Sequence, residues 1–197
     1  MNYRLQGIAF ELDVLRYFHS ISYRYRSSCQ QMASLPSFKP FSLVQTGQSG
    51  DQGIDLAGTL FGSISVTAQC KKLSNARVPV SSVREFIGAL PTYYDSENGK
   101  AKQKIGFFAS VSGYSKDAVN LAKTSDSSIA LLDFSYQEEG ATRELSLKSF
   151  CTSSGLRSSL KDIKFVETPS RYTSPGSALT INSISCLYQG KCMFLFK

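Results

Sequence analysis

The stretch Gly50-Asp51-Gln52-Gly53-Ile54-Asp55 is followed, fourteen residues after its last acid, by Gln69-Cys70-Lys71, and these two stretches decide the fold. The first reads as an acid at the end of a glycine loop. The second places an amide and a lysine two positions apart, and side chains at that spacing on a strand point to the same face of a sheet. Gln69 and Lys71 are therefore predicted to project together, while Cys70 points the opposite way into the core.

A β-hairpin between the two stretches would fix the place of Asp55. If the turn is Phe61-Gly62-Ser63, the numbers of cross-strand partners sum to 124, and Asp55 lies opposite Gln69. Directly opposed side chains have Cβ atoms about 4.5–5.5 Å apart. An acid, an amide oxygen and the Lys71 ammonium then converge on one spot.

These three side chains suit hydrolysis of a phosphodiester with a divalent metal. Mg²⁺ prefers oxygen ligands and takes few protein carboxylates, so Asp55 can be its charged ligand and Gln69 a neutral one. The metal lowers the pKa of a bound water and neutralises charge on the phosphate. Lys71 can orient or deprotonate the attacking water, or stabilise the pentacovalent phosphorus. The alternative is a surface hairpin that carries ordinary polar residues.

The order of these motifs resembles the Mrr-type branch of the PD-(D/E)XK restriction-endonuclease-like superfamily, in which a hairpin acid precedes (E/Q)-x-K. The resemblance covers about residues 5–135. Further stretches agree with the family's first helix, with the helix after its catalytic strand, and with its late helix and edge strand: Gly7-Ile8-Ala9-Phe10-Glu11, Val83-Arg84-Glu85-Phe86-Ile87-Gly88-Ala89-Leu90, and Ser112-Gly113-Tyr114-Ser115-Lys116-Asp117-Ala118 with Ile129-Ala130-Leu131-Leu132-Asp133.

The resemblance implies a Mg²⁺- or Mn²⁺-dependent DNA endonuclease. It implies that Glu11 faces the metal together with Asp55 and Gln69, and that Lys71 is the cation at the attacking water. The chain carries Gln69 where many relatives have glutamate, so the site has one negative charge fewer and Glu11 gains importance. Without the family pattern, Glu11 would be interpreted as a solvated helix glutamate.

Within this branch the chain is most similar to fungal mitochondrial proteins described as required for respiratory growth. That similarity implies a mitochondrial location and a role in maintenance or degradation of mitochondrial DNA. The N-terminus lacks a secretory hydrophobic region, and Glu11 and Asp13 interrupt the pattern of a transit peptide. No apolar stretch approaches the ~20 residues that a membrane span requires.

The predicted fold is α/β: a restriction-endonuclease-like core with a mixed central sheet flanked by helices, in the order αβββαβ, and a small β-rich C-terminal extension. The 197 residues suit one domain, with the nuclease core over residues 1–136 and the extension over 137–197, packed on the core. Helices are expected over 5–19, 80–90 and 115–122. Strands are expected over 21–26, 41–46, 54–59, 64–71, 105–111, 129–134, 179–188 and 191–196.

Two of the expected helices have specific patterns. Residues 5–19 carry an apolar stripe at helical spacing, which consists of Leu5, Ile8, Leu12, Leu15 and Phe18. The helix from residue 80 is expected to have Ser81 or Ser82 as its N-cap and Pro91 as its stop.

The charge predicts a polyanionic partner. The net charge is +7 and the isoelectric point is near 9.2. Many small basic proteins bind nothing in particular, so DNA is favoured mainly by the hairpin motif. Contacts to the DNA backbone are expected from the glycine loop, from cations after the catalytic strand, and from a helix N-terminus: Gln48, Ser49, Gly50, Lys72, Arg77, Ser115 and Lys116.

Several other classes of site have little support in the sequence. The five cysteines are an odd number without a C-x-x-C pair, which favours a reducing compartment and disfavours zinc, and His19 is the lone histidine. No G-x-S-x-G or G-x-x-x-x-G-K-[ST] motif occurs, so a serine triad or an ATP-driven step is not indicated.

Two alternatives stay open. One is a Holliday-junction or branched-DNA resolvase, which has a similar core with an N-terminal helix glutamate and would form a homodimer. The other is a non-catalytic DNA-binding protein that retains the nuclease fold, with Gln69 marking a weakened site. The sequence does not reveal sequence or methylation preference, because base-edge contacts cannot be identified from it.

Overall fold

The computed structural model describes residues 3–28, 41–46, 53–96, 103–139, 142–160, 163–169, 182–188 and 191–196. Its elements in chain order are α1 (Tyr3–Ser28), β1 (Phe41–Gln45), β2 (Leu56–Leu60), β3 (Ile64–Lys71), α2 (Val80–Ser96), β4 (Gln103–Ser110), α3 (Lys116–Thr124), β5 (Ile129–Glu139), β6 (Thr142–Thr152), α4 (Ser154–Ser159), β7 (Ile163–Pro169), β8 (Asn182–Tyr188) and β9 (Lys191–Phe196).

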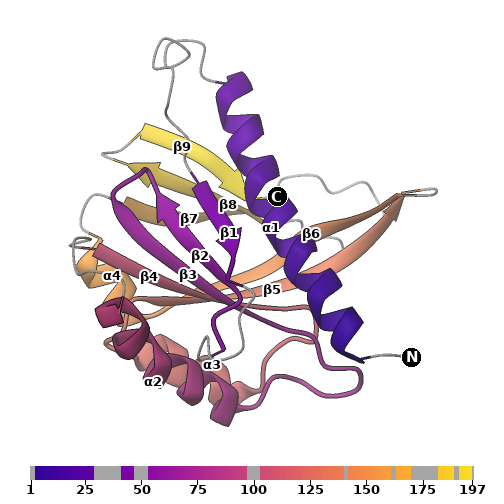
Figure 1. Cartoon of the computed structure of the whole chain (residues 1–197). Helices are drawn as coiled ribbons and strands as arrows, with labels where there is room; N and C mark the ends of the chain where they lie inside the picture. Colours follow the sequence, from indigo (N-terminus) through magenta and orange to yellow (C-terminus); the bar gives the residue numbers. More distant parts are fainter. Residues whose placement is uncertain are drawn as a thin grey trace.

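Strands β1 to β6 form one mixed sheet in which sequence order is also spatial order. Strands β1, β2 and β3 are antiparallel, β3 to β5 are parallel, and β6 returns antiparallel to β5. Two neighbouring parallel strands must be joined by a crossover connection, and such connections are right-handed. The two connections β3 to β4 and β4 to β5 therefore place their helices on the same face of the sheet. Helices α2 and α3 accordingly lie together below the sheet, while α1 crosses its other face (Figure 1). The predicted mixed sheet flanked by helices is confirmed.

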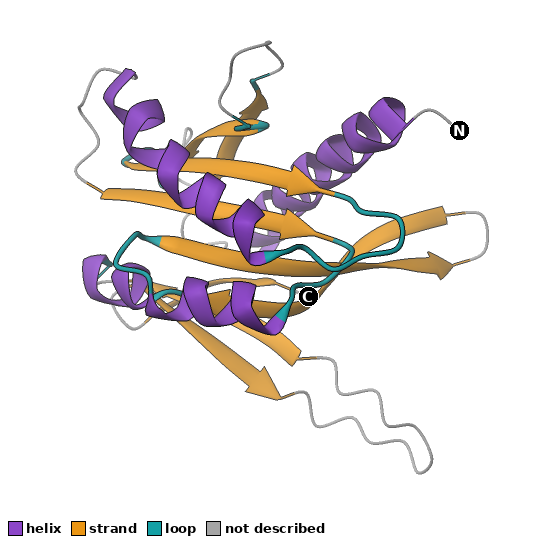
Figure 2. Ribbon diagram, turned by 90° about the horizontal axis from the view of Figure 1, so that it is seen from below, coloured by secondary structure: helices purple, strands orange, loops and turns teal. Residues whose placement is uncertain are grey.

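The sheet separates two hydrophobic clusters. Helix α1 packs Phe10, Val14 and Phe18 against one face, and α2 packs Val83 and Phe86 against the other. Figure 2 shows α2 and α3 side by side across the strands. Strand β4 is covered on both faces, which explains why its last six residues are all buried rather than alternating.

The prediction for the end of α1 was wrong. Residues 21–26 belong to this helix and do not form a strand. The buried stripe of α1 consists of Phe10, Val14, Tyr17, Phe18 and Ile21, so Ile21 continues a helical repeat. Of the expected stripe, Leu5 and Ile8 are exposed, at 63% and 39%. Tertiary packing has selected the second of two apolar stripes that this sequence offers.

The predicted start of α2 at residue 80 is confirmed, but its predicted cap and its predicted end were wrong. The helix begins at Val80, so Ser81 and Ser82 lie inside its first turn and do not cap it. Pro91 lies within the helix, which continues to Ser96. Proline has no N–H, so the carbonyl four residues before Pro91 lacks its usual helical hydrogen bond. Because Pro91 is exposed, that carbonyl lies on the solvent side of the helix. By contrast, the predicted cap of α3 is confirmed: the Ser115 hydroxyl accepts a hydrogen bond from the Ala118 amide at 3.2 Å.

The predicted hairpin register is confirmed. Strands β2 and β3 pair Leu56 with Ala68 and Leu60 with Ile64, so partner numbers sum to 124. The turn is residues 61–63, with positive φ at Phe61 and Gly62. Even-numbered residues of β3, including Cys70, face the α1 cluster, which leaves Gln69 and Lys71 for the opposite face.

The C-terminal residues extend the core sheet and form a second one. Strand β6 pairs with β5 along the core sheet, and β7, β8 and β9 form a separate antiparallel sheet. In this second sheet, β9 contacts α1 and β8 contacts β6. The predicted strands around residues 189–190 are confirmed as β8 and β9. The division of the chain at residue 136 stays a prediction.

Tyr114 yields a stability test. Its buried hydroxyl donates to the carbonyls of Phe108 at 2.6 Å and Leu132 at 3.2 Å, and so links β4 to β5. Tyr114→Phe is expected to lower the free energy of unfolding at pH 7 by about 1 kcal/mol, as measured by urea denaturation.

The pH dependence gives this prediction a second readout. Burial, aided by Asp133, raises the pKa of Tyr114 well above its usual value. The unfolded chain therefore ionises first, and this contribution is full below about pH 10 and lost as pH rises further. The Phe variant should lose less stability than the wild type between pH 9 and pH 11 (roughly the range around the unfolded tyrosine pKa). Equal alkaline losses in the two proteins would contradict this account.

Candidate active site

Asp55 is held between β1 and β3 at the point where β2 begins. Its amide donates to the Ala68 carbonyl at 2.9 Å, and its carbonyl accepts from the Thr46 amide at 3.0 Å. Its carboxylate accepts a hydrogen bond from the Cys70 amide, with Oδ2 2.6 Å from the nitrogen. The carboxylate thus contacts the β3 backbone at Cys70, between Gln69 and Lys71, while the regular pairing of β2 with β3 ends at Leu56 and Ala68.

Gln69 carries an unsatisfied buried oxygen. Its Oε1 atom is inaccessible to solvent and has no hydrogen-bond partner among the residues that the structure describes. Leaving a buried carbonyl without a partner costs about 1–3 kcal/mol, so such an atom calls for an explanation. A cation at Oε1 would supply one.

Gly53 provides the space that Gln69 occupies. A Cβ atom added at Gly53 would lie 2.9 Å from the Gln69 Nε2 atom. The glycine also has φ of +79°, a conformation that residues with a side chain rarely adopt. The positive φ therefore favours glycine in the turn, and the missing Cβ leaves room for the Gln69 amide.

Lys71 projects toward α2. Its Nζ donates to the Ser82 hydroxyl at 2.8 Å, and Ser82 is only 5% exposed. The ion pairs within the described ranges are Arg16–Asp13 and Lys148–Asp133, and neither includes Lys71. The ammonium is held by a neutral group and keeps its charge for a substrate.

Glu11 approaches from the opposite face. Its Oε2 accepts a hydrogen bond from the Gln45 side-chain amide at 2.9 Å. Gln45 is the last residue of β1 and pairs with Leu56, the neighbour of Asp55. The acid of α1 that the family pattern implies therefore lies near the start of β2.

The pKa of the Cys70 thiol responds to the charges of Asp55 and Glu11. Burial raises the pKa of this thiol well above its usual value, and Asp55 and Glu11 raise it further. The two carboxylates are therefore close enough to Cys70 to oppose formation of a thiolate. Glu11 comes from the α1 side, Gln69 and Lys71 from the α2 side, and Asp55 lies at the backbone between them.

This donor set fits a hard divalent cation. The described part of the chain contains no group of three His, Cys, Asp or Glu residues that could hold a metal by themselves. Two carboxylates and one amide oxygen match the ligand preference of Mg²⁺, which keeps several waters and takes few carboxylates. Cys70 adds no thiolate because its proton is retained. The orphaned Gln69 oxygen is the atom that argues for this fit.

Two contacts of the site were missed by sequence reasoning. Gln45 holds Glu11, and Ser82 holds Lys71. Gln45 could have been noticed as a polar residue that ends an apolar strand directly before the glycine loop. Ser82 was considered only as a helix cap.

Four of the predicted DNA contacts, Lys72, Arg77, Ser115 and Lys116, lie on or directly beside two adjoining loops. The loop after β3 joins the loop after β4 through Val78, whose amide donates to Gly113 at 2.9 Å and whose carbonyl accepts from Ser115 at 3.0 Å. Arg77 is exposed on the first of these loops, and Lys116 is exposed as the first residue of α3, directly after the second loop. Lys72 stacks over the Tyr136 ring, with Nζ 5.5 Å from its centroid. Gln48, Ser49 and Gly50 lie outside the described residues.

Asp133 is another half-buried acid at this edge of the sheet. It aligns through Ser110 with Lys71, at the ends of the parallel strands. Burial raises its pKa, while Lys148, the Gly113 amide and Arg77 act in the opposite direction. Its Oδ2 lies 4.0 Å from the Lys148 Nζ. Asp133 thus helps to hold the loop after β4.

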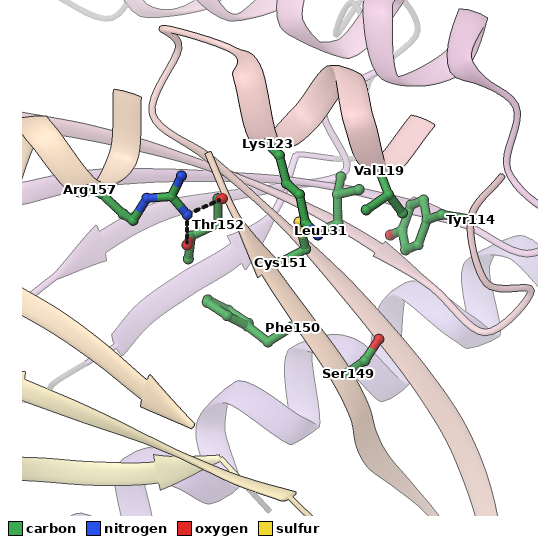
Figure 3. Close-up of a pocket in the computed structure, with 9 residues that line it drawn as sticks. All are labelled: Tyr114, Val119, Lys123, Leu131, Ser149, Phe150, Cys151, Thr152 and Arg157. Carbon is green, nitrogen blue, oxygen red and sulfur yellow. Dashed lines mark hydrogen bonds between the residues drawn. The ribbon is translucent and has the colours of Figure 1, made fainter. Parts of the chain in front are cut away.

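A cavity of about 330 Å³ lies elsewhere, between α3, α4 and strands β5 and β6 (Figure 3). Lys123 and Arg157 are among the residues that line it, and the Arg157 guanidinium donates to the Thr152 carbonyl at 3.1 Å. Glu11, Asp55, Gln69 and Lys71 do not line it. The candidate active site is therefore the open end of the sheet and not this cavity.

Comparison with known proteins gives one family. A family model for restriction endonucleases of the Mrr catalytic type matches residues 5–136. That span contains Glu11, Asp55, Gln69 and Lys71 and ends within β5. No curated protein matches the chain. Among the helices that the structure describes, none is long and apolar enough to cross a membrane.

The electrostatic placement of Glu11 can be tested through Cys70. Because both acids raise the pKa of the thiol, Glu11→Gln is expected to increase the rate at which iodoacetamide alkylates Cys70 at pH 8.5 (about the pKa of a free thiol). Mass spectrometry of peptides resolves Cys70 from the other cysteines. The matched control is Glu85→Gln, an exposed glutamate of α2. An unchanged rate at Cys70 in Glu11→Gln would place Glu11 away from the site.

Proposed function

Because the chain belongs to the restriction-endonuclease family of the Mrr catalytic type, we propose that it is a metal-dependent endonuclease that hydrolyses phosphodiester bonds of DNA. The observation that carries the proposal is the buried Oε1 of Gln69, which has no hydrogen-bond partner among the described residues, beside the Asp55 carboxylate that is fixed at the amide of the next residue, Cys70. An atom in that state suits a cation better than it suits a packed core.

Mg²⁺ or Mn²⁺ is the proposed cofactor. Asp55, Gln69 and Glu11 would hold it. When bound, such an ion lowers the pKa of a coordinated water and neutralises charge on the phosphate. The bond between the Cys70 amide and Asp55 holds the carboxylate in one orientation before any ion arrives, which reduces the reorganisation that binding requires.

Lys71 is the proposed cationic catalytic residue. A lysine ammonium has three N–H donors, and the Ser82 hydroxyl takes one of them. The other two can donate to a non-bridging phosphate oxygen and to the attacking water. These bonds would stabilise the negative charge that develops on the phosphate in the transition state.

The two loops joined at Val78 are the proposed contact with the DNA backbone. The proposal is supported by Lys72 and Arg77, which follow the end of β3 at Lys71 on the first loop, and by Lys116, which begins α3 after the second loop. The net charge of +7 favours a polyanion as the partner. Ser115 adds the amides of a helix N-terminus.

A mitochondrial role in DNA maintenance or degradation is proposed on the resemblance to fungal respiratory-growth proteins alone. Imaging of a tagged chain against a mitochondrial marker would test the location. The resolvase alternative predicts a homodimer, so its first test is size in solution followed by cleavage of four-way junctions. The non-catalytic alternative predicts DNA binding that neither EDTA nor Lys71→Ala changes.

Replacement of Asp55 tests the enzyme proposal. Asp55→Asn keeps an oxygen that can accept from the Cys70 amide but removes the charge. It is expected to fold normally and to lose activity by about 100-fold or more, since a metal site supplies several kcal/mol of charge stabilisation. The measurement is nicking of supercoiled plasmid with Mg²⁺, Mn²⁺ or EDTA.

The matched control for this test is Asp126→Asn, which changes an exposed acid. It should cut as the wild type does. If the wild type cuts neither DNA nor RNA with either metal, or if Asp55→Asn is as active as the wild type, the enzyme proposal is lost.

The DNA-contact proposal is tested by salt dependence. Arg77→Ala and Lys116→Ala should each weaken binding and reduce the slope of log Kd against log salt by about 0.9. Affinity is measured by fluorescence anisotropy in EDTA, which prevents cleavage. Lys123→Ala, at the other end of α3, is the control and should leave the slope unchanged. An unchanged slope in the first two variants would remove these loops from the interface.

A further inference from the structure

We infer that Ser82 is a positioning residue that orients the Lys71 ammonium for catalysis, an inference that rests on the proposed function. The contact joins the last residue of the catalytic strand to the first turn of α2. Nζ lies 2.8 Å from the hydroxyl oxygen, a good hydrogen-bond distance. Ser82 is buried, so water competes little for its oxygen.

The packing of α2 on the sheet fixes the position of the Ser82 hydroxyl. Lysine has a flexible four-carbon stem and loses about 2 kcal/mol of side-chain entropy when it is held in one conformation. Val83 and Phe86 of α2 are 0% and 1% exposed and pack against the sheet. Ser82 therefore cannot follow a moving lysine, and its bond selects the conformations in which Nζ stays at the end of β3.

The chemical type of the anchor is also suited to catalysis. A carboxylate in this position would orient the ammonium but would also neutralise its charge. A hydroxyl orients it through one donor and leaves the positive charge and two donors for the phosphate and the water. This explains how Lys71 can be held by the protein and still act on the substrate.

The neighbouring serine has a different environment. Ser81 is exposed, whereas Ser82 is 5% exposed, although the two are adjacent in the same helical turn. Of these two serines, Ser82 is the one whose hydroxyl accepts a hydrogen bond from Lys71 among the described contacts. The pair therefore supplies a matched control, because Ser81→Ala changes the same kind of side chain in the same turn without touching the lysine.

The test compares Ser82→Ala, Ser82→Thr and Ser81→Ala in the full chain. In single-turnover cleavage with saturating Mn²⁺, Ser82→Ala should lower the rate constant by about 10- to 100-fold, the usual effect of a small misplacement of a catalytic group. The substrate KM should stay within about twofold, because the DNA-binding loops are unchanged. Ser82→Thr keeps the hydroxyl and should recover most of the rate, and Ser81→Ala should match the wild type.

A second readout does not depend on activity. The proteins are treated with a limiting amount of acetic anhydride, and acetylation of Lys71 is compared with that of Lys123 by mass spectrometry. Ser82→Ala should increase labelling of Lys71 relative to Lys123, because the amine is no longer engaged by the hydroxyl. Ser82→Thr should not. Thermal unfolding of each variant establishes that the protein is folded at the assay temperature.

The outcomes separate the inference from the proposed function. If the wild type is inactive but Ser82→Ala changes labelling of Lys71, the anchor is supported and the enzyme proposal fails. If the wild type cuts DNA and Ser82→Ala cuts equally fast with unchanged labelling, the inference is wrong and the enzyme proposal stands. A purely structural role predicts a lower unfolding temperature with a normal rate constant below it, and that result also overturns the inference.

Discussion

The hydrogen bond from the Cys70 amide to the Asp55 carboxylate is the interaction on which the site depends. Strand β2 pairs regularly with β3 from Leu56 onward, and the preceding residue, Asp55, stays bonded to β3 through its amide, which donates to the Ala68 carbonyl. The Asp55 side chain takes the place of a backbone acceptor at that point. This bond has two roles: it connects Asp55 to β3, and it holds the carboxylate beside the strand that carries Gln69 and Lys71. Experiments must therefore distinguish loss of the Asp55 side chain from loss of its charge.

The arrangement around this bond has a consistent electrostatic design. The two carboxylates bring negative charge from two places: Asp55 lies at the start of β2 against the β3 backbone, and Glu11 lies on α1. Gln69 adds an oxygen without adding charge. The Cys70 thiol stays protonated under that field, so it adds neither charge nor a soft ligand. The ion pairs of the described residues do not include Lys71, and its hydrogen-bond partner Ser82 is neutral, so its positive charge is not neutralised by either. The result is a site for a hard cation beside a free positive charge, as phosphodiester hydrolysis requires.

The sequence predicts what depends on short-range periodicity and misses what depends on packing. The turn at residues 61–63 and the alternation of β3 determine the hairpin register, so the pairing of residues 56–60 with residues 64–68 could be derived from residue numbers alone. Helix α1 offers two apolar stripes at helical spacing, and only contact with the sheet selects the one containing Phe10 and Val14. Gln45 and Ser82 are ordinary polar residues in the sequence, and their importance comes from partners 34 and 11 positions away.

The most direct test of the central claim is the position of a bound metal. Crystals soaked in Mn²⁺ and measured near the manganese absorption edge would locate the ion by its anomalous signal. The account predicts a peak about 2.1–2.3 Å from the Gln69 Oε1 atom and from a carboxylate oxygen of Asp55, slightly longer than Mg²⁺–oxygen bonds. A manganese peak elsewhere, with Oε1 of Gln69 still without a cation, would contradict it.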